Sequence, residues 1–293
     1  MVSLEIAGIL LAIAGRDFRV RHGHEPAYEP FIKRDSVTAP DISVNVVVSG
    51  LPDISGAKRI FNSESSWSLC VEGGDHYLVL NPPGIGNGPL WIARFDLSFK
   101  TITVFCDKQL TTYEEDLFIP NPLTYPLDQI LLMYYLAVKG GAILHAAGAV
   151  LNNKGYIFPG RSRAGKSTLI RQFLSRQRGE ALSDDRIVVR KVDGTFKAFG
   201  TPWPGEADIA ANKSVPLSGI FFIAHGNNNR IRDLNRREAF ERLLPVTSIP
   251  WYDREITEKL LVFCEDIVSH VPAYGLSFKP TGEVVDILEN FSQ

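Results

Sequence analysis

The sequence lacks the cysteine pattern of small secreted or zinc-binding proteins. Its 293 residues include only three cysteines, Cys70, Cys106 and Cys264, which lie far apart and form no C-x-x-C pair. This spacing argues against a disulfide framework and a cysteine zinc site. It predicts isolated thiols in a reducing compartment.

Long apolar runs and an excess of charge of one sign are also missing. The apolar run at residues 6–14 is too short to span a bilayer, and Glu5 precedes it instead of Lys or Arg. We therefore expect a strand there and no secretory signal. The formal net charge is −2, so no overall field attracts nucleic acid or an anionic membrane. These features predict a cytoplasmic protein that binds neither.

The composition is that of a folded protein, and the hydrophobic patterns of its two halves differ. Hydrophobic residues make up 45% of the chain and charged residues 22%, which is typical of globular domains. The first half carries strand patterns with little helical periodicity, at residues 42–48, 76–80, 90–95 and 101–106. The glycine- and proline-rich residues 81–89 predict a hairpin loop.

An α/β pattern follows a proline-rich linker at residues 120–126. We expect helices at residues 127–138, 167–177, 236–244 and 255–270, and strands at 142–145, 149–151, 155–159, 187–190, 195–199, 219–224 and 274–278. Residues 152–155 and 193–194 read as hairpin turns. The sequence thus predicts a β-rich domain at residues 1–120 and an α/β domain with a mixed sheet at residues 121–293.

The most specific motif fits the pattern G-x-x-x-x-G-K-[ST], the phosphate-binding loop or P-loop. In such a loop, consecutive backbone amides point at phosphate oxygens, the lysine reaches the β- and γ-phosphates, and the hydroxyl binds Mg²⁺. A predicted strand precedes the motif and a predicted helix follows it, which disfavours the alternative of a simple glycine-rich turn. The residues expected to bind nucleotide are Gly160, Arg161, Ser162, Arg163, Ala164, Gly165, Lys166, Ser167 and Thr168.

An acidic pair lies about one helix and one turn after this motif. Asp184 and Asp185 begin 17 residues after Ser167, so they come beside the loop if the chain returns to the same sheet edge. One aspartate could then hold the metal while the other orients or deprotonates an acceptor hydroxyl. The alternative is a turn with two solvated aspartates.

Other polar residues carry weaker signals. His145 ends a predicted strand 15 residues before Gly160, and it either faces the phosphates or is a satisfied core histidine. In the rigid loop at residues 201–206, Glu206 is a candidate second metal ligand, and Trp203 either stacks on substrate or anchors the loop. The remaining histidines show no metal-ligand spacing: His22, His24, His76, His225 and His270.

One cluster of basic residues interrupts an otherwise scattered distribution of charge. It consists of Arg230, Arg232, Arg236 and Arg237, with Asp233 and Glu238 between them. A solvated start of a helix and a phosphate contact both remain open for this cluster.

The segments at residues 141–145, 160–167 and 182–186 together resemble the catalytic domain of the HPr kinase/phosphorylase family. The resemblance implies a fold related to the phosphoenolpyruvate carboxykinase core, with ATP as the nucleotide. It implies that Asp184 takes the proton from the acceptor serine, that Asp185 assists magnesium binding, and that His145 lies near the transferred phosphate.

Two segments depart from that family. The bifunctional enzymes carry Glu-x-Arg-Gly after the acidic pair, whereas residues 197–200 here read Lys-Ala-Phe-Gly, so Glu206 is the candidate replacement for that carboxylate. The N-terminal half resembles instead the β-rich region of HPr kinase-related proteins. Some of those proteins phosphorylate free serine, and others the C-terminal serine of lasso peptides.

The sequence therefore favours an Mg²⁺-assisted, ATP-dependent kinase with Lys166, Asp184 and His145 as catalytic residues and Ser167, Asp185 and Glu206 as metal ligands. The acceptor is an alcohol: a serine of a peptide or protein, free serine, or a small polyol. The main alternative is an ATP-binding regulatory or assembly protein without turnover. A carboxykinase acting on an oxoacid is disfavoured, because no metal-binding lysine–histidine set is recognisable. The hexameric precedent of the family leaves a homo-oligomer open.

Overall fold

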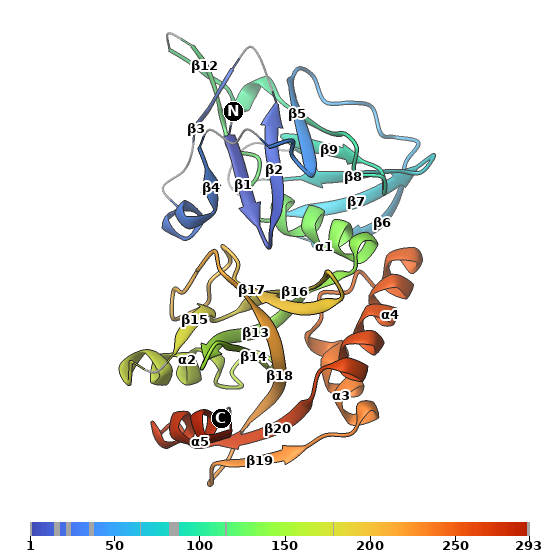
Figure 1. Cartoon of the computed structure of the whole chain (residues 1–293). Helices are drawn as coiled ribbons and strands as arrows, with labels where there is room; N and C mark the ends of the chain where they lie inside the picture. Colours follow the sequence, from blue (N-terminus) through green and yellow to red (C-terminus); the bar gives the residue numbers. More distant parts are fainter. Residues whose placement is uncertain are drawn as a thin grey trace. The chain divides into compact units, whose positions relative to one another are not determined.

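A computed structural model describes residues 2–14, 18–21, 25–34, 38–64, 66–81, 88–114, 116–177 and 179–291. The chain is mixed α/β, and more of its residues lie in strands than in helices (Figure 1). It divides into two compact units: residues 1–26 with 32–135, and residues 27–31 with 136–293. The division falls within α1 (Leu127–Lys139).

The first unit contains a nine-stranded sheet in the order β4-β1-β2-β5-β10-β9-β8-β7-β6 and a three-stranded sheet in the order β11-β12-β3. The short 3-10 segment η2 (Lys108–Leu110) follows β10, whereas all but the first residue of η1 (Pro26–Phe31) belongs to the second unit. The strands are β1 (Val2–Ile6), β2 (Ile9–Ala14), β3 (Arg19–Arg21), β4 (Ile32–Lys33), β5 (Ile42–Val48), β6 (Lys58–Asn62), β7 (Trp67–Glu72), β8 (Asp75–Leu80), β9 (Trp91–Phe95), β10 (Ile102–Cys106), β11 (Thr112–Tyr113) and β12 (Leu117–Pro120).

The four strands predicted from alternation in this half are confirmed as β5, β8, β9 and β10. The single strand predicted at residues 6–14 is wrong, because β1 and β2 form a hairpin there. Ala7 and Gly8 both have positive φ, 56° and 68°, which makes a two-residue turn inside the apolar run. Most of the predicted loop between β8 and β9, residues 82–87, lies outside the described residues.

The second unit is built on a mixed sheet in the order β14-β13-β16-β17-β18-β20-β19. In addition, β15 pairs with β13, and β14 pairs with β18. The second of these pairings closes five strands into a ring: β14, β13, β16, β17 and β18. The strands β14, β18 and β20 run parallel to one another. The strands are β13 (Gly141–Leu151), β14 (Lys154–Pro159), β15 (Glu180–Ser183), β16 (Arg186–Val192), β17 (Thr195–Phe199), β18 (Ser214–His225), β19 (Arg230–Asp233) and β20 (Ala273–Phe278).

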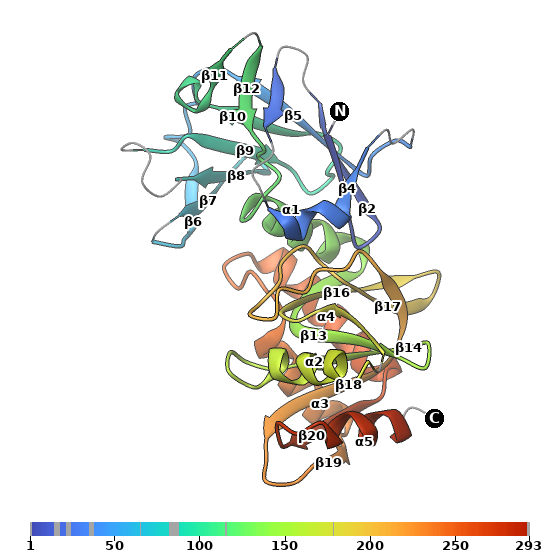
Figure 2. The same cartoon turned by 90° about the vertical axis from the view of Figure 1, so that its left-hand side faces the viewer.

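Helices cover both faces of this sheet. Figures 1 and 2 show α2 (Lys166–Ser175) and α5 (Glu283–Phe291) on one side and α3 (Arg236–Leu243) and α4 (Arg254–His270) on the other. The short η3 (Leu244–Val246) follows α3 directly.

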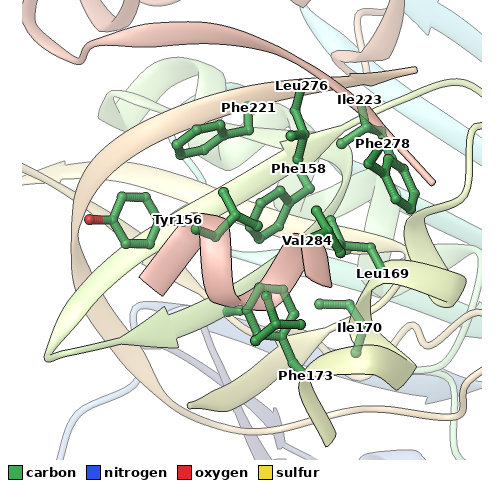
Figure 3. Packing of buried hydrophobic residues seen from close by; sticks show 14 of the residues in the cluster. Tyr156, Phe158, Leu169, Ile170, Phe173, Phe221, Ile223, Leu276, Phe278 and Val284 are labelled. Atoms are coloured by element: carbon green, nitrogen blue, oxygen red, sulfur yellow. The ribbon is translucent and has the colours of Figure 1, made fainter. Parts of the chain in front are cut away.

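A continuous apolar cluster fixes α2 and α5 to the sheet. Phe158 of β14 lies at its centre, with ring centroids 5.8 Å from Phe221 of β18 and 5.8 Å from Phe173 of α2 (Figure 3). Val284 of α5 is fully buried in the same cluster. Burying side chains of this size stabilises the fold by about 1.5–3 kcal/mol each, so the helix after the phosphate loop is firmly anchored.

Most of the C-terminal elements are as predicted, with a few exceptions. Residues 142–145 and 149–151 belong to one strand, β13, because the small residues between them are buried and carry no alternating pattern. Three elements were not predicted: β15, α5, and β19, an edge strand of sequence Arg-Ile-Arg-Asp with little apolar signal. Of the two interpretations left open for the arginine cluster, the start of a helix holds for Arg236 and Arg237 only, since Arg230 and Arg232 lie in a strand.

Candidate nucleotide-phosphate site

The loop at residues 160–165 joins the end of β14 to the start of α2, and its two glycines are sterically required. A Cβ added at Gly160 would lie 2.8 Å from the Cβ of Ala164. Gly165 has φ +98°, and a Cβ there would lie 2.9 Å from the ring of Phe278. Larger residues at either position would open the turn, so the sequence pattern corresponds to a tight backbone geometry.

The start of α2 offers backbone amides to an anion, next to the exposed loop. Arg161, Ser162 and Arg163 of the loop are exposed. The first amides of a helix have no carbonyl partner within it, so those of Lys166, Ser167 and Thr168 suit phosphate oxygens. The nine residues predicted to bind nucleotide therefore form one continuous turn and helix start.

Asp184 connects this loop to the loop after β17. Its Oδ2 accepts from the hydroxyl of Ser167 at 2.9 Å and from the amide of Ala207 at 2.8 Å. Its Oδ1 accepts from the amides of Gly205 at 2.8 Å and Ile209 at 3.4 Å. The side chain is fully buried. Four donors occupy the roughly four lone-pair positions of a carboxylate, so Asp184 is a structural acceptor for both loops.

Asp185 points to a different set of groups. Its Oδ1 lies 2.9 Å from Nε2 of His145 and 3.8 Å from Nζ of Lys166, and its Oδ2 lies 3.6 Å from a guanidinium nitrogen of Arg186. The register of β13 against β16 pairs His145 with Arg186, which brings the predicted histidine beside the acidic pair. The Asp185 side chain is 28% exposed, in contrast to Asp184.

Lys166 completes this group. Its Nζ lies 2.7 Å from Nε2 of His145 and donates to the carbonyl oxygen of Gly160 at 3.1 Å. Nε2 of His145 therefore faces a cation and a carboxylate at once, and it can accept from Lys166 or donate to Asp185 but not both.

The environment lowers the pKa values of both charged partners. Burial lowers the pKa of Lys166 and outweighs the opposing charge of Asp185. Burial raises the pKa of Asp185, but the hydrogen bond with His145 and the charges of Arg186, His145 and Lys166 together lower it below its usual range. Asp185 is thus ionised and available near neutral pH.

The other predicted site residues are less closely placed. Glu206 is exposed, and its carbonyl oxygen accepts from the guanidinium of Arg171 at 2.6 Å. The part of the chain that the structure describes contains no group of three or more His, Cys, Asp or Glu side chains that could hold a metal ion. A metal-binding role for Glu206 stays a prediction. Trp203 is 7% exposed, which favours its role as an anchor of the loop.

Sequence reasoning gave no role to three residues that contact the site. Arg186 approaches Asp185, Arg171 holds the loop at Glu206, and Nε2 of His225 lies 2.9 Å from the carbonyl oxygen of Arg163. Arg186 directly follows the acidic pair and so carried a usable signal. The other two come from distant segments without a motif.

These residues fit a magnesium-bound nucleotide phosphate. The start of α2 offers amides and a lysine to the phosphates, and Ser167 with the partly exposed Asp185 supplies oxygen atoms of the kind that Mg²⁺ prefers, whereas the oxygens of Asp184 are already occupied by protein donors. No helix among the described residues combines the length and hydrophobicity of a bilayer span.

Comparison with known proteins gives a distant likeness to solved structures and no match by sequence. No model of a protein family matches the sequence, and no curated protein matches it. Among solved structures, the chain is similar to an Hpr(Ser) kinase/phosphatase from Coxiella burnetii, with 13% identity and a TM-score of 0.31 over 51% of this chain and 87% of that one. At this level of similarity we base the assignment below on this chain's own residues.

Proposed function

We propose that the chain is an ATP-dependent, Mg²⁺-assisted kinase that transfers the γ-phosphoryl group to an alcohol. The observation that carries the proposal is the juxtaposition at Lys166. The phosphate-holding lysine lies 3.8 Å from Asp185, a partly exposed carboxylate, while Asp184 holds the neighbouring Ser167. Simple nucleotide binding needs no such carboxylate beside the lysine, whereas phosphoryl transfer needs a group that aligns the acceptor hydroxyl.

The geometry favours Asp185 as the group that receives the acceptor's proton. The resemblance to the HPr kinase family implies Asp184 in that role. However, all four lone-pair positions of Asp184 are occupied by donors, and its side chain is fully buried. Asp185 keeps an accessible carboxylate beside His145. We therefore assign Asp185 as the base and Asp184 as the residue that positions Ser167 and the loop at residues 201–209.

The proposed step conserves atoms and charge. The acceptor oxygen forms a bond to the γ-phosphorus, the bond to the β–γ bridging oxygen breaks, and ADP leaves with that oxygen. The proton of the hydroxyl goes to Asp185. Lys166 and the first amides of α2 hold the phosphates. Ser167, with Asp184 behind it, is the residue that would hold Mg²⁺, whose charge stabilises the phosphoryl oxygens.

The test is release of ADP from Mg-ATP with and without an added alcohol, using free serine, serine peptides and small polyols as acceptors. We expect ADP formation that depends on one acceptor and falls by about 10²–10⁴ in Asp185→Asn, the usual contribution of a general base. Arg254→Gln is the matched control, because its guanidinium pairs with Glu258 on α4 and is 92% exposed. Tight ATP binding with no acceptor-dependent ADP across the panel would favour a regulatory protein instead.

A further inference from the structure

We propose that the second unit carries another anion site, separate from the phosphate loop, for a small molecule with at least two negative charges on carboxylate or phosphate oxygens. The site is a hollow of about 450 Å³ lined by Arg230, Arg232 and Arg242, which we call the arginine hollow. Its volume lies within the usual range for small-molecule pockets.

Strand register places two of the arginines on one face of the sheet. Arg230 of β19 pairs with Ser277 of β20, which pairs with Ala224 of β18. Arg232 pairs in the same way with Gly275. Paired residues share a face, and residues two apart on a strand do so as well. Two long cationic side chains on the edge strand therefore flank a row of small residues, which creates the depression.

The floor and the rim of the arginine hollow have different character. Phe222, which is 5% exposed, lines the floor, while Arg242 of α3 and the polar residues Asn227 and Asn228 complete the rim. A Cβ added at Gly275 would meet only Leu234 at 3.8 Å and a carbonyl oxygen at 4.0 Å, so the floor is open there. An apolar floor with polar atoms around it suits a short carbon skeleton carrying charged groups.

The charges of the arginine hollow are not balanced by the protein. Glu238 pairs with Arg232 at 3.0 Å, and Arg242 acts on the same carboxylate at longer range. Within the described ranges, no carboxylate lies within ion-pair distance of Arg230 or Arg242. Guanidinium groups form paired hydrogen bonds to carboxylate or phosphate oxygens, so three of them against one carboxylate select a multiply charged anion.

The arginine hollow cannot be an extension of the phosphate loop. Ala224 and Ser277 line the hollow, whereas the next residues, His225 and Phe278, contact or pack beside the loop. Because successive residues of a strand point to opposite faces, the two sites lie on opposite faces of the same strands. The triphosphate held at Lys166 is therefore not the ligand of the hollow.

Calorimetric titration with citrate and, separately, with glycerol phosphate tests the proposal. We expect saturable binding of at least one of them, weakened by about tenfold or more when Arg230→Gln and Arg242→Gln are combined, since charged hydrogen bonds contribute most of the affinity. Arg237→Gln is the matched control, because Arg237 is on α3, is 88% exposed and pairs with Glu241. We expect less than about a twofold change in that variant.

Two more variants distinguish the arginine hollow from the phosphate loop and from a general attraction of anions to the surface. Lys166→Ala removes the lysine of the phosphate loop and should leave the binding unchanged, whether or not the chain is a kinase. Gly275→Val fills the floor without changing charge and should weaken binding while circular dichroism stays that of the wild type. Binding of citrate alone or of glycerol phosphate alone supports the site and identifies its chemistry. Absence of saturable binding of both, or equal loss in Arg237→Gln or Lys166→Ala, overturns it.

Discussion

Exchanging the two neighbouring aspartates for asparagine should separate stability from catalysis. In Asp184→Asn, an amide nitrogen replaces Oδ2 and faces the amide of Ala207, which lies 2.8 Å from that oxygen. The hydroxyl of Ser167 can turn to accept from the new donor, but a backbone amide cannot. One buried N–H is therefore left without an acceptor, and the remaining bonds lose their charge.

The size of the effect follows from these bonds. A hydrogen bond to a charged group contributes about 1.5–3 kcal/mol, and an unsatisfied buried donor costs about 1–3 kcal/mol. We expect Asp184→Asn to lower the free energy of unfolding by about 2–5 kcal/mol. For a domain of this size that corresponds to a fall in Tm of roughly 5–15 °C.

Asp185→Asn is the matched variant, because its side chain is partly exposed and accepts no backbone amide among the described contacts. We expect its Tm to change by about 2 °C or less, while acceptor-dependent ADP release falls strongly. Calorimetry or thermal fluorescence measures the first quantity and needs no knowledge of the acceptor. A wild-type Tm for Asp184→Asn, or a lower Tm for Asp185→Asn than for Asp184→Asn, would refute the roles assigned to the two carboxylates.

Three other changes test separate parts of the structure. Gly165→Ala should abolish ATP binding measured by calorimetry, because the residue has φ +98° and its new methyl group would lie 2.9 Å from the Phe278 ring. Wild-type affinity for ATP in this variant would contradict the loop geometry. Burial raises the pKa of Cys264 to about 11, so at pH 8 only about one thiol in 1,000 is ionised. Maleimide labelling of this thiol should therefore be at least about 100-fold slower in the native protein than in denaturant. Equal labelling rates would disprove the burial of Cys264. Phe158→Ala should lower the free energy of unfolding by about 3–5 kcal/mol in denaturant titrations, and a change below about 1 kcal/mol would contradict its central place in the cluster.

The local sequence determined much about the candidate phosphate site. Two glycines, a lysine and a serine at fixed spacing are typical of a tight turn that leads into a helix, so the loop and the helix after it could be predicted without any tertiary information. The strand before the loop and the hairpin after β13 were predicted for the same reason, since short-range patterns decide them.

Only the tertiary structure decided which aspartate faces which partner. Asp184 and Asp185 are adjacent and chemically identical, and on the extended chain nothing distinguishes them. The amides that enclose Asp184 come from a loop about 20 residues later, and His145 reaches Asp185 through the register of β13 against β16. The arginine hollow likewise depends on strand pairing across β18, β20 and β19. Long-range pairing sets side-chain neighbours that no local pattern encodes.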